Sequence, residues 1–195
     1  MKNIILLCFC SILCLVFAYS QERNSLTEYD NKLFSQLIDL LGHPIPPPPT
    51  GENYDTIPSM ELIDSLAKVE LKIGIYPTVK TFTNNLKTRQ ISLNCLNKYT
   101  RENSSKTYLI NLEKLNSENK HKISLIDTTI SSQEQFSDHD IIVMFYKPYY
   151  NEDLSKALVK LSVSRGTLSG FLTLVCLEKN NENWKVVNSK ELSAW

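Results

Sequence analysis

The sequence has no excess of charge of either sign. Its 195 residues carry 21 Lys and Arg against 21 Asp and Glu. A protein that binds nucleic acid through its net charge needs surplus Lys and Arg to release counterions from the phosphates, so this class of function is disfavoured. Hydrophobic residues make up 42% of the chain, aromatic residues 9% and charged residues 22%. This composition suffices for the core of one folded domain.

Signature motifs of several enzyme classes are also missing. The sequence contains no Gly-x-Ser-x-Gly motif, and Ser169 lacks the preceding glycine that a nucleophile elbow requires. Gly166 and Gly170 are not followed by Gly-Lys-Ser, so we interpret them as turn and bulge glycines and not as a phosphate-binding loop. There is no CxxC pair of the kind that holds zinc. We therefore predict no cofactor and no metal site.

The first twenty residues have the organisation of a signal peptide. Lys2 is the only charged residue among the first 21, and an apolar run covers residues 4–17. Ala18-Tyr19-Ser20 then places small residues three and one before Gln21, which is the pattern that signal peptidase recognises. We predict cleavage after Ser20. The apolar run is shorter than the roughly 18 residues that a permanent membrane span needs, so no transmembrane segment is expected in the mature chain.

Retention at a membrane is the alternative. The leader contains Cys8, Cys10 and Cys14, and a lipid-modified cysteine normally follows a small residue. Each of these three follows Leu or Phe, which disfavours lipidation. We predict a secreted or periplasmic protein, with anchoring through an uncleaved N-terminal helix or a lipidated cysteine as the alternative.

Residues 21–42 are expected to form an amphipathic helix. Ser25 and Glu28 have the spacing of a capping box. Gly42 and Pro44 are typical of a helix end. Apolar residues recur at three- and four-residue intervals between these signals, at Leu26, Tyr29, Leu33, Phe34, Leu37, Ile38 and Leu41.

The proline-rich stretch 43–57 is interpreted as a linker. Pro46 to Pro49 are consecutive prolines, which favour the stiff, extended polyproline II conformation. This linker separates the predicted helix from the rest of the domain. The helix therefore either packs back on the domain or presents its apolar face to another molecule.

Residues 58–195 are predicted to form an α+β domain. A short helix is expected at 58–66, a half-buried strand at 69–75, and helix and loop between 78 and 122. The last part of the chain has β-prone stretches at 123–130, 141–147, 156–163, 168–177 and 184–189. The short connections between the last four stretches leave no room for crossover helices. An antiparallel sheet covered by helices is therefore the predicted fold.

Only two cysteines remain after signal cleavage, Cys95 and Cys176. In an oxidising compartment they can form one disulfide, which would close a long loop. Cys176 also lies in an apolar strand pattern, where an unpaired cysteine packs as a small hydrophobic residue. The sequence leaves both alternatives open.

The C-terminal segment resembles a type of uncharacterised secreted bacterial protein. The resemblance rests on a strand from Ser155, the turn Gly166-Thr167-Leu168-Ser169-Gly170, a second strand, and a hairpin ending in Trp184-Lys185-Val186-Val187. Asn183 stands where glycine is usual, and Asn tolerates the left-handed turn conformation. A similar ending occurs in NTF2-like domains, which implies a curved sheet packed against helices around a pocket. The resemblance implies no catalytic residues.

Three residues are candidates for a ligand-binding site. His139 lies in Asp138-His139-Asp140, where a carboxylate can orient the imidazole or all three can contribute to a metal site. Adjacent residues on extended backbone face opposite ways, so a solvated turn is favoured there. Tyr149 and Tyr150 follow a strand near a turn, where exposed rings can stack on a sugar or peptide. Packing and loop structure are the alternative roles.

These observations favour an exported, non-enzymatic domain that binds a small-molecule ligand or a partner protein. The alternative is a small hydrolase with a site around His139. It requires a nucleophile within hydrogen-bond reach of His139 and a carboxylate that orients the imidazole. A third hypothesis is an interaction protein anchored at the cell envelope.

Overall fold

The computed structural model describes residues 29–40, 61, 65, 69–81, 86–97, 107–118 and 121–195. The predicted signal peptide at 1–20 and the linker at 43–57 lie outside these residues. Within the described ranges, no helix is long and apolar enough to cross a membrane.

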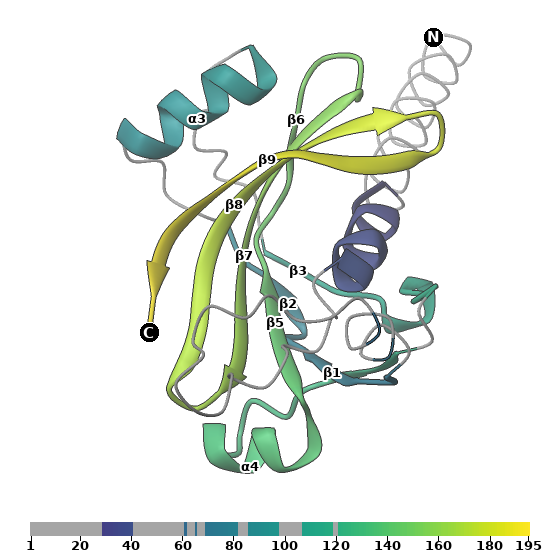
Figure 1. The fold of residues 1–195 in the computed structure, drawn as a ribbon, viewed down its shortest axis with the longest axis vertical. Helices are drawn as coiled ribbons and strands as arrows, with labels where there is room; N and C mark the ends of the chain where they lie inside the picture. The colour runs from purple at the N-terminus through teal and green to yellow at the C-terminus, as the bar shows by residue number, and fades with distance from the viewer. Residues whose placement is uncertain are drawn as a thin grey trace, which may run out of the picture.

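The architecture is α+β, as the sequence predicts (Figure 1). One sheet has the order β4 (Lys122–Leu125), β1 (Lys72–Ile75), β5 (Ile141–Phe145), β7 (Lys156–Gly166), β8 (Ser169–Asn180) and β9 (Asn183–Ala194), and β6 (Tyr149–Tyr150) also pairs with β7. A second sheet joins β2 (Thr78–Val79) to β3 (Tyr108–Leu109). Residues 29–40 are helical, followed by α3 (Leu86–Leu96), the 3-10 turn η1 (Leu112–Lys114) and α4 (Ser132–Asp138).

The sheet is mostly antiparallel, but one edge is parallel. The strands β5, β7, β8 and β9 are antiparallel neighbours, as their short connections predict. β1 instead pairs in parallel with both β4 and β5. The chain reaches β5 from β4 through α4, and this helix supplies the connection out of the sheet that parallel pairing needs.

The β-prone stretch predicted at 123–130 is a shorter strand in the structure, and a helix that the sequence does not predict follows it. Strand β4 ends at Leu125, and α4 begins after the N-cap Ser131. The hydroxyl of Ser131 accepts from the Glu134 amide, and the Glu134 carboxylate accepts from the Ser131 amide in return. This capping box satisfies two amides at the start of a helix that buries few apolar side chains.

The tight turn of the β8–β9 hairpin also differs from expectation. Asn181, and not Asn183, has the positive φ of 57°. Asn183 is the first residue of β9 and pairs with Asn180 across the two-residue turn. Asn is well suited to the left-handed position of such a turn.

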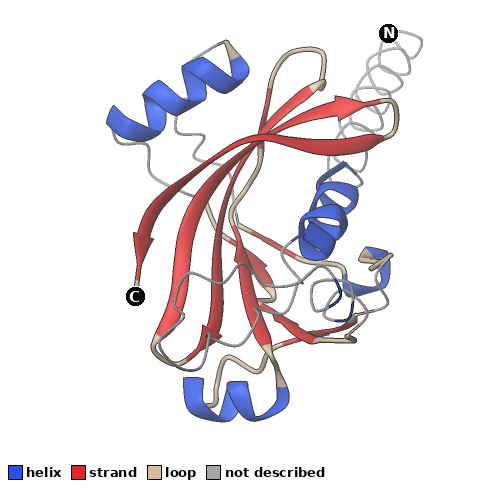
Figure 2. Cartoon of the chain, viewed as in Figure 1, coloured by secondary structure: helices blue, strands red, loops and turns tan. Residues whose placement is uncertain are grey.

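The two faces of the long strands pack against different helices, as Figure 2 shows. On the first face, here called the core face, twenty buried residues form the main hydrophobic cluster. The helix at 29–40 is part of this cluster. Its Leu33, Phe34, Leu37 and Ile38 are at most 1% exposed, and the Phe34 ring stacks on Phe145 with centroids 4.2 Å apart. The helix therefore packs back on the domain.

Polar side chains of this helix bind the neighbouring segments. The Gln36 Oε1 accepts from the Trp184 amide at 2.7 Å, and its Nε2 donates to Asn183 Oδ1 at 3.0 Å. Asp39 accepts from the Glu118 amide at 2.9 Å. Because β9 is an edge strand of the described sheet, the Trp184 amide has no neighbouring strand to bind on that side, and Gln36 accepts its hydrogen bond instead.

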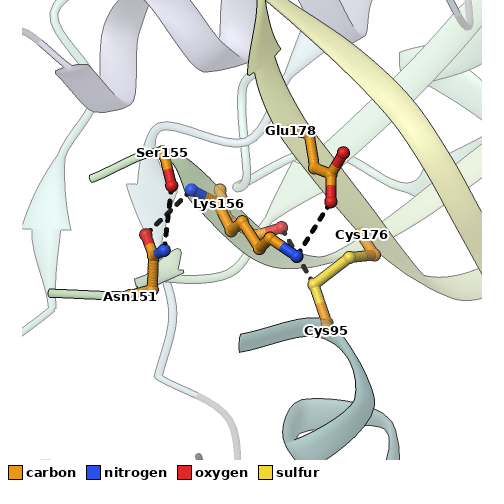
Figure 3. The surroundings of a disulfide bond; sticks show 7 residues. Cys95, Asn151, Ser155, Lys156, Cys176 and Glu178 are labelled. Carbon is orange, nitrogen blue, oxygen red and sulfur yellow. Dashed lines mark hydrogen bonds and ion pairs between the residues drawn. A yellow bond between two sulfur atoms is a disulfide. The ribbon is translucent and has the colours of Figure 1, made fainter. Parts of the chain in front are cut away.

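The opposite face, here called the α3 face, carries a second and smaller cluster of buried residues. It consists of Cys95, Leu96, Leu158, Leu174 and Cys176, with Tyr149 among the partly buried residues around it. A disulfide joins Cys95 of α3 to Cys176 of β8 (Figure 3). Helix α3 is thus held to the sheet by a covalent bond as well as by a few apolar contacts.

Candidate ligand-binding site

The aromatic residues singled out in the sequence are divided between the two faces. Side chains alternate along a strand, so Phe145 and Tyr150 pack with the core-face cluster, whereas Tyr146 and Tyr149 pack with the α3-face cluster. Tyr149 and Tyr150 therefore do not form one stacking platform.

Tyr150 contributes to a buried polar cluster under the helix at 29–40. Its hydroxyl donates to Asp30 Oδ1 at 2.7 Å, and the Tyr108 hydroxyl donates to Asp30 Oδ2. Asp30 is 6% exposed. Burial raises the pKa of this carboxyl, while the two phenol hydrogen bonds and Lys147 act in the opposite direction. Burial and the Asp30 charge likewise raise the pKa of Tyr108 and Tyr150. We interpret the cluster as a structural attachment for the helix.

His139 lies at the C-terminal cap of α4 and does not project freely into solvent. Its Nδ1 is 2.8 Å from the Gln135 carbonyl oxygen, and its Nε2 is 2.8 Å from Ser124 Oγ on β4. A carbonyl can only accept, so Nδ1 carries a proton; in the neutral imidazole Nε2 then accepts from the Ser124 hydroxyl. Gly74 makes this approach possible, because a Cβ there would lie 2.8 Å from His139 Cδ2.

The two aspartates beside His139 do not orient its ring through any described contact. Asp140 Oδ2 instead accepts from the Lys72 amide at 2.8 Å, and Asp138 is exposed. Across the described ranges, no group of three or more His, Cys, Asp or Glu side chains is arranged to hold a metal ion. The site around His139 thus has a hydroxyl partner and a backbone carbonyl in place of an orienting carboxylate.

A cavity of about 340 Å³ lies on the α3 face, between α3 and strands β7, β8 and β9. Leu174 and the Cys95–Cys176 disulfide form part of its apolar lining. Its polar lining comes from all four of these elements and comprises Gln90, Asn94, Lys156, Glu178, Asn188, Ser189 and Lys190. None of the candidate residues from the sequence, Tyr149, Tyr150 or His139, lines this cavity.

A bulge in β9 shapes one wall of the cavity. Cys176 pairs with Asn188 and Leu177 pairs with Val186, so Val187 is an extra residue between them. Val187 is 47% exposed and lines the cavity together with the next three residues. A regular strand would direct alternate side chains to the two faces; a bulge redirects them, and bulges are frequent beside functional sites.

An ion pair between β7 and β8 forms another part of the cavity wall. Lys156 Nζ is 2.9 Å from Glu178 Oε1, and Figure 3 shows both side chains next to Cys95 and Cys176. The Asn151 side chain fixes the start of β7, since its Oδ1 accepts from the Lys156 amide at 2.8 Å. Both charges are partly exposed, so the pair contributes little to stability but remains available to a ligand.

The cavity could not be found from sequence spacing. Its lining residues come from α3, β7, β8 and β9, which are far apart in the chain. The one local signal is the cysteine at position 95, and the sequence leaves its pairing open. Comparison with known proteins finds no family model, curated protein or solved structure that matches this chain.

Proposed function

We propose that this chain is an exported binding protein and that its ligand is a small molecule held on the α3 face. The cavity between α3 and strands β7–β9 is the observation that supports the proposal. Its volume and its mixture of apolar floor and polar walls are typical of small-molecule sites. A protein partner would instead favour a flat apolar surface.

Closing the cavity tests this proposal. Val187→Trp places a large ring at the bulge, and Leu168→Trp is the matched control because Leu168 is 87% exposed and is not among the cavity-lining residues. A fragment library of neutral, anionic and cationic small molecules is screened by two-dimensional NMR of the mature protein. We expect hits that shift the amides of Asn94 and Asn188, and we expect Val187→Trp but not Leu168→Trp to abolish these shifts. Hits that bind both variants equally would contradict the proposal.

A hydrolase is the second candidate, and the contact between Ser124 and His139 favours it. His139 Nε2 lies 2.8 Å from Ser124 Oγ, within the range of a nucleophile and its general base. In this hypothesis Ser124 attacks an ester carbonyl while His139 takes the hydroxyl proton. His139 then returns that proton to the leaving alcohol, and water releases the acid from Ser124.

Ser124→Ala tests the second candidate with p-nitrophenyl acetate as substrate. Ser137→Ala is the control, because Ser137 is exposed on α4 and its hydroxyl binds only the Glu134 carbonyl in the described contacts. Hydrolysis above background that disappears in Ser124→Ala and persists in Ser137→Ala would support the hydrolase. Equal rates in all three proteins would exclude Ser124 as the nucleophile.

Export itself is tested by the mass of the mature protein. A chain that begins at Gln21 supports release after signal cleavage. A chain that retains residues 1–20, or that carries a lipid on Cys8, Cys10 or Cys14, supports anchoring at the cell envelope instead.

A further inference from the structure

We propose that the ligand of the α3-face cavity is a small linear carboxylate, and that Lys190 binds its charged end. This inference rests on the proposed function, because it names the class of molecule that the same cavity takes. Three properties of the cavity support it: the balance of charge in its walls, the order of charged and apolar groups along its floor, and its volume.

The walls carry an excess of one positive charge. The charged lining residues are Lys156, Glu178 and Lys190. Lys156 and Glu178 neutralise each other, since Nζ and Oε1 are 2.9 Å apart. No ion pair between described residues involves Lys190. The neighbouring Glu191 pairs with Thr173, which faces away from Leu174 and Cys176. An anionic group therefore gains more from these walls than a cationic one.

The charges lie at opposite ends of an apolar floor. Lys190 pairs with Leu174 across the β8–β9 ladder, and Glu178 lies four residues further along β8. At about 3.3 Å per residue, the two rungs are about 13 Å apart. Leu174 forms the floor at the Lys190 rung, and the disulfide at Cys176 lies between the two rungs. A molecule with a carboxylate at the Lys190 end and an apolar chain along the floor matches this order of groups.

Amide side chains flank the middle of the cavity. Asn94 comes from α3 and Asn188 from β9, so they line it from two different elements. Each can donate and accept hydrogen bonds, which suits a polar group within the ligand chain. The volume of about 340 Å³ equals that of about eleven water molecules at about 30 Å³ each. The cavity therefore fits a ligand with roughly a dozen non-hydrogen atoms.

Three probes that differ only in their head group test the proposal: octanoate, octylamine and 1-octanol. Each is titrated into the mature, disulfide-bonded protein while the amides of Asn94 and Asn188 are followed by two-dimensional NMR. We expect octanoate to bind most tightly and its affinity to fall with added salt, because Lys190 is exposed and its charge is screened. Lys190→Gln is expected to weaken octanoate about fivefold and to leave 1-octanol unchanged. Lys114→Gln, on the exposed turn η1, serves as the control.

The outcomes separate this inference from the proposed function. Selective binding of octanoate that depends on Lys190 supports both. If 1-octanol or octylamine binds in the cavity as tightly as octanoate, the cavity is a binding site but the preference for a carboxylate is wrong. If none of the three probes shifts the cavity amides, both the inference and the choice of this cavity as the binding site are overturned.

Discussion

The two faces of the long strands are built by the same alternating pattern but are stabilised in different ways. On the core face, a cluster of twenty buried residues includes four from the helix at 29–40, and each of these four is at most 1% exposed. On the α3 face, only five buried residues form the cluster, and two of them are joined by the disulfide. A helix with little apolar contact is held by a covalent bond, and the space that its side chains do not fill is the cavity.

The difference matters for function because packing and binding compete for the same surface. Apolar area that is buried within the protein stabilises the fold by about 25 cal/mol per Å² but is no longer available to a ligand. The core face uses its apolar area for stability. The α3 face keeps part of its apolar area accessible, and the disulfide substitutes for the lost packing.

The largest effect is expected from removing the central side chain of the core face. Phe34 is fully buried and stacks on Phe145, so Phe34→Ala should lower the free energy of unfolding by about 3–5 kcal/mol. Urea denaturation followed by circular dichroism measures this change. Lys32→Ala on the exposed side of the same helix is the control, with an expected loss below about 1 kcal/mol because its partner Glu182 is also exposed. Similar losses in both variants would show that the helix does not depend on its buried face.

A somewhat smaller effect is expected from removing the covalent link on the α3 face. The disulfide spans 81 residues, and the double change Cys95→Ala with Cys176→Ala should cost about 2–4 kcal/mol. Amide hydrogen exchange shows which elements lose protection when the disulfide is removed. Protection should fall in α3 by much more than in the helix at 29–40, because α3 has the fewer buried contacts. Equal loss of protection in both helices would show that the two faces unfold as one unit.

The smallest effect is expected from Asp30 on the core face, because the protonation of this buried carboxyl makes the stability of the fold depend on pH. Burial raises the pKa of this carboxyl above its ordinary value of 3.8. The folded state therefore binds the proton more tightly than the unfolded state does, and protonation of Asp30 stabilises the fold. This stabilisation is complete below pH 3.8. It is lost as the pH rises through the pKa of Asp30 in the folded state.

Asp30→Asn isolates this contribution, because Asn does not titrate. We expect the stability of the wild-type protein relative to Asp30→Asn to decrease as the pH rises above 3.8, as measured by urea denaturation at several pH values. A relative stability that instead rises with pH would mean that Tyr108, Tyr150 and Lys147 stabilise the ionised carboxylate by more than burial destabilises it.

Elements with a strong repeat could be predicted from the sequence. The helix at 29–40 lies within the stretch predicted at 21–42, and β7, β8 and β9 each begin within one residue of a predicted stretch but continue past its end, β9 as far as Ala194. The sequence does not predict α4, because this helix buries only Gln135 and so has no apolar stripe. Its capping-box residues, Ser131 and Glu134, are the signal that the sequence offers for this helix. The resemblance to secreted bacterial proteins and to NTF2-like domains remains a prediction.

The contacts of the candidate site residues could not be predicted from the sequence. Tyr149 and Tyr150 are neighbours in sequence, but the alternation of side chains along a strand places them on opposite faces. His139 has an aspartate on each side in sequence, but its hydrogen-bond partners in the structure are Ser124 and the Gln135 carbonyl. Contacts of this kind arise from the pairing of strands and the docking of helices, which local spacing does not specify.

The sequence by itself determined the α+β class, the alternation along the long strands and the amphipathic helix at 29–40, because each follows from a repeat within one segment. Only the tertiary structure decided which way that helix packs, that Cys95 meets Cys176, and that a cavity lies between α3 and the sheet. The physical reason is that local periodicity fixes which side of an element is apolar. What covers that side depends on contacts between residues that are distant in the chain.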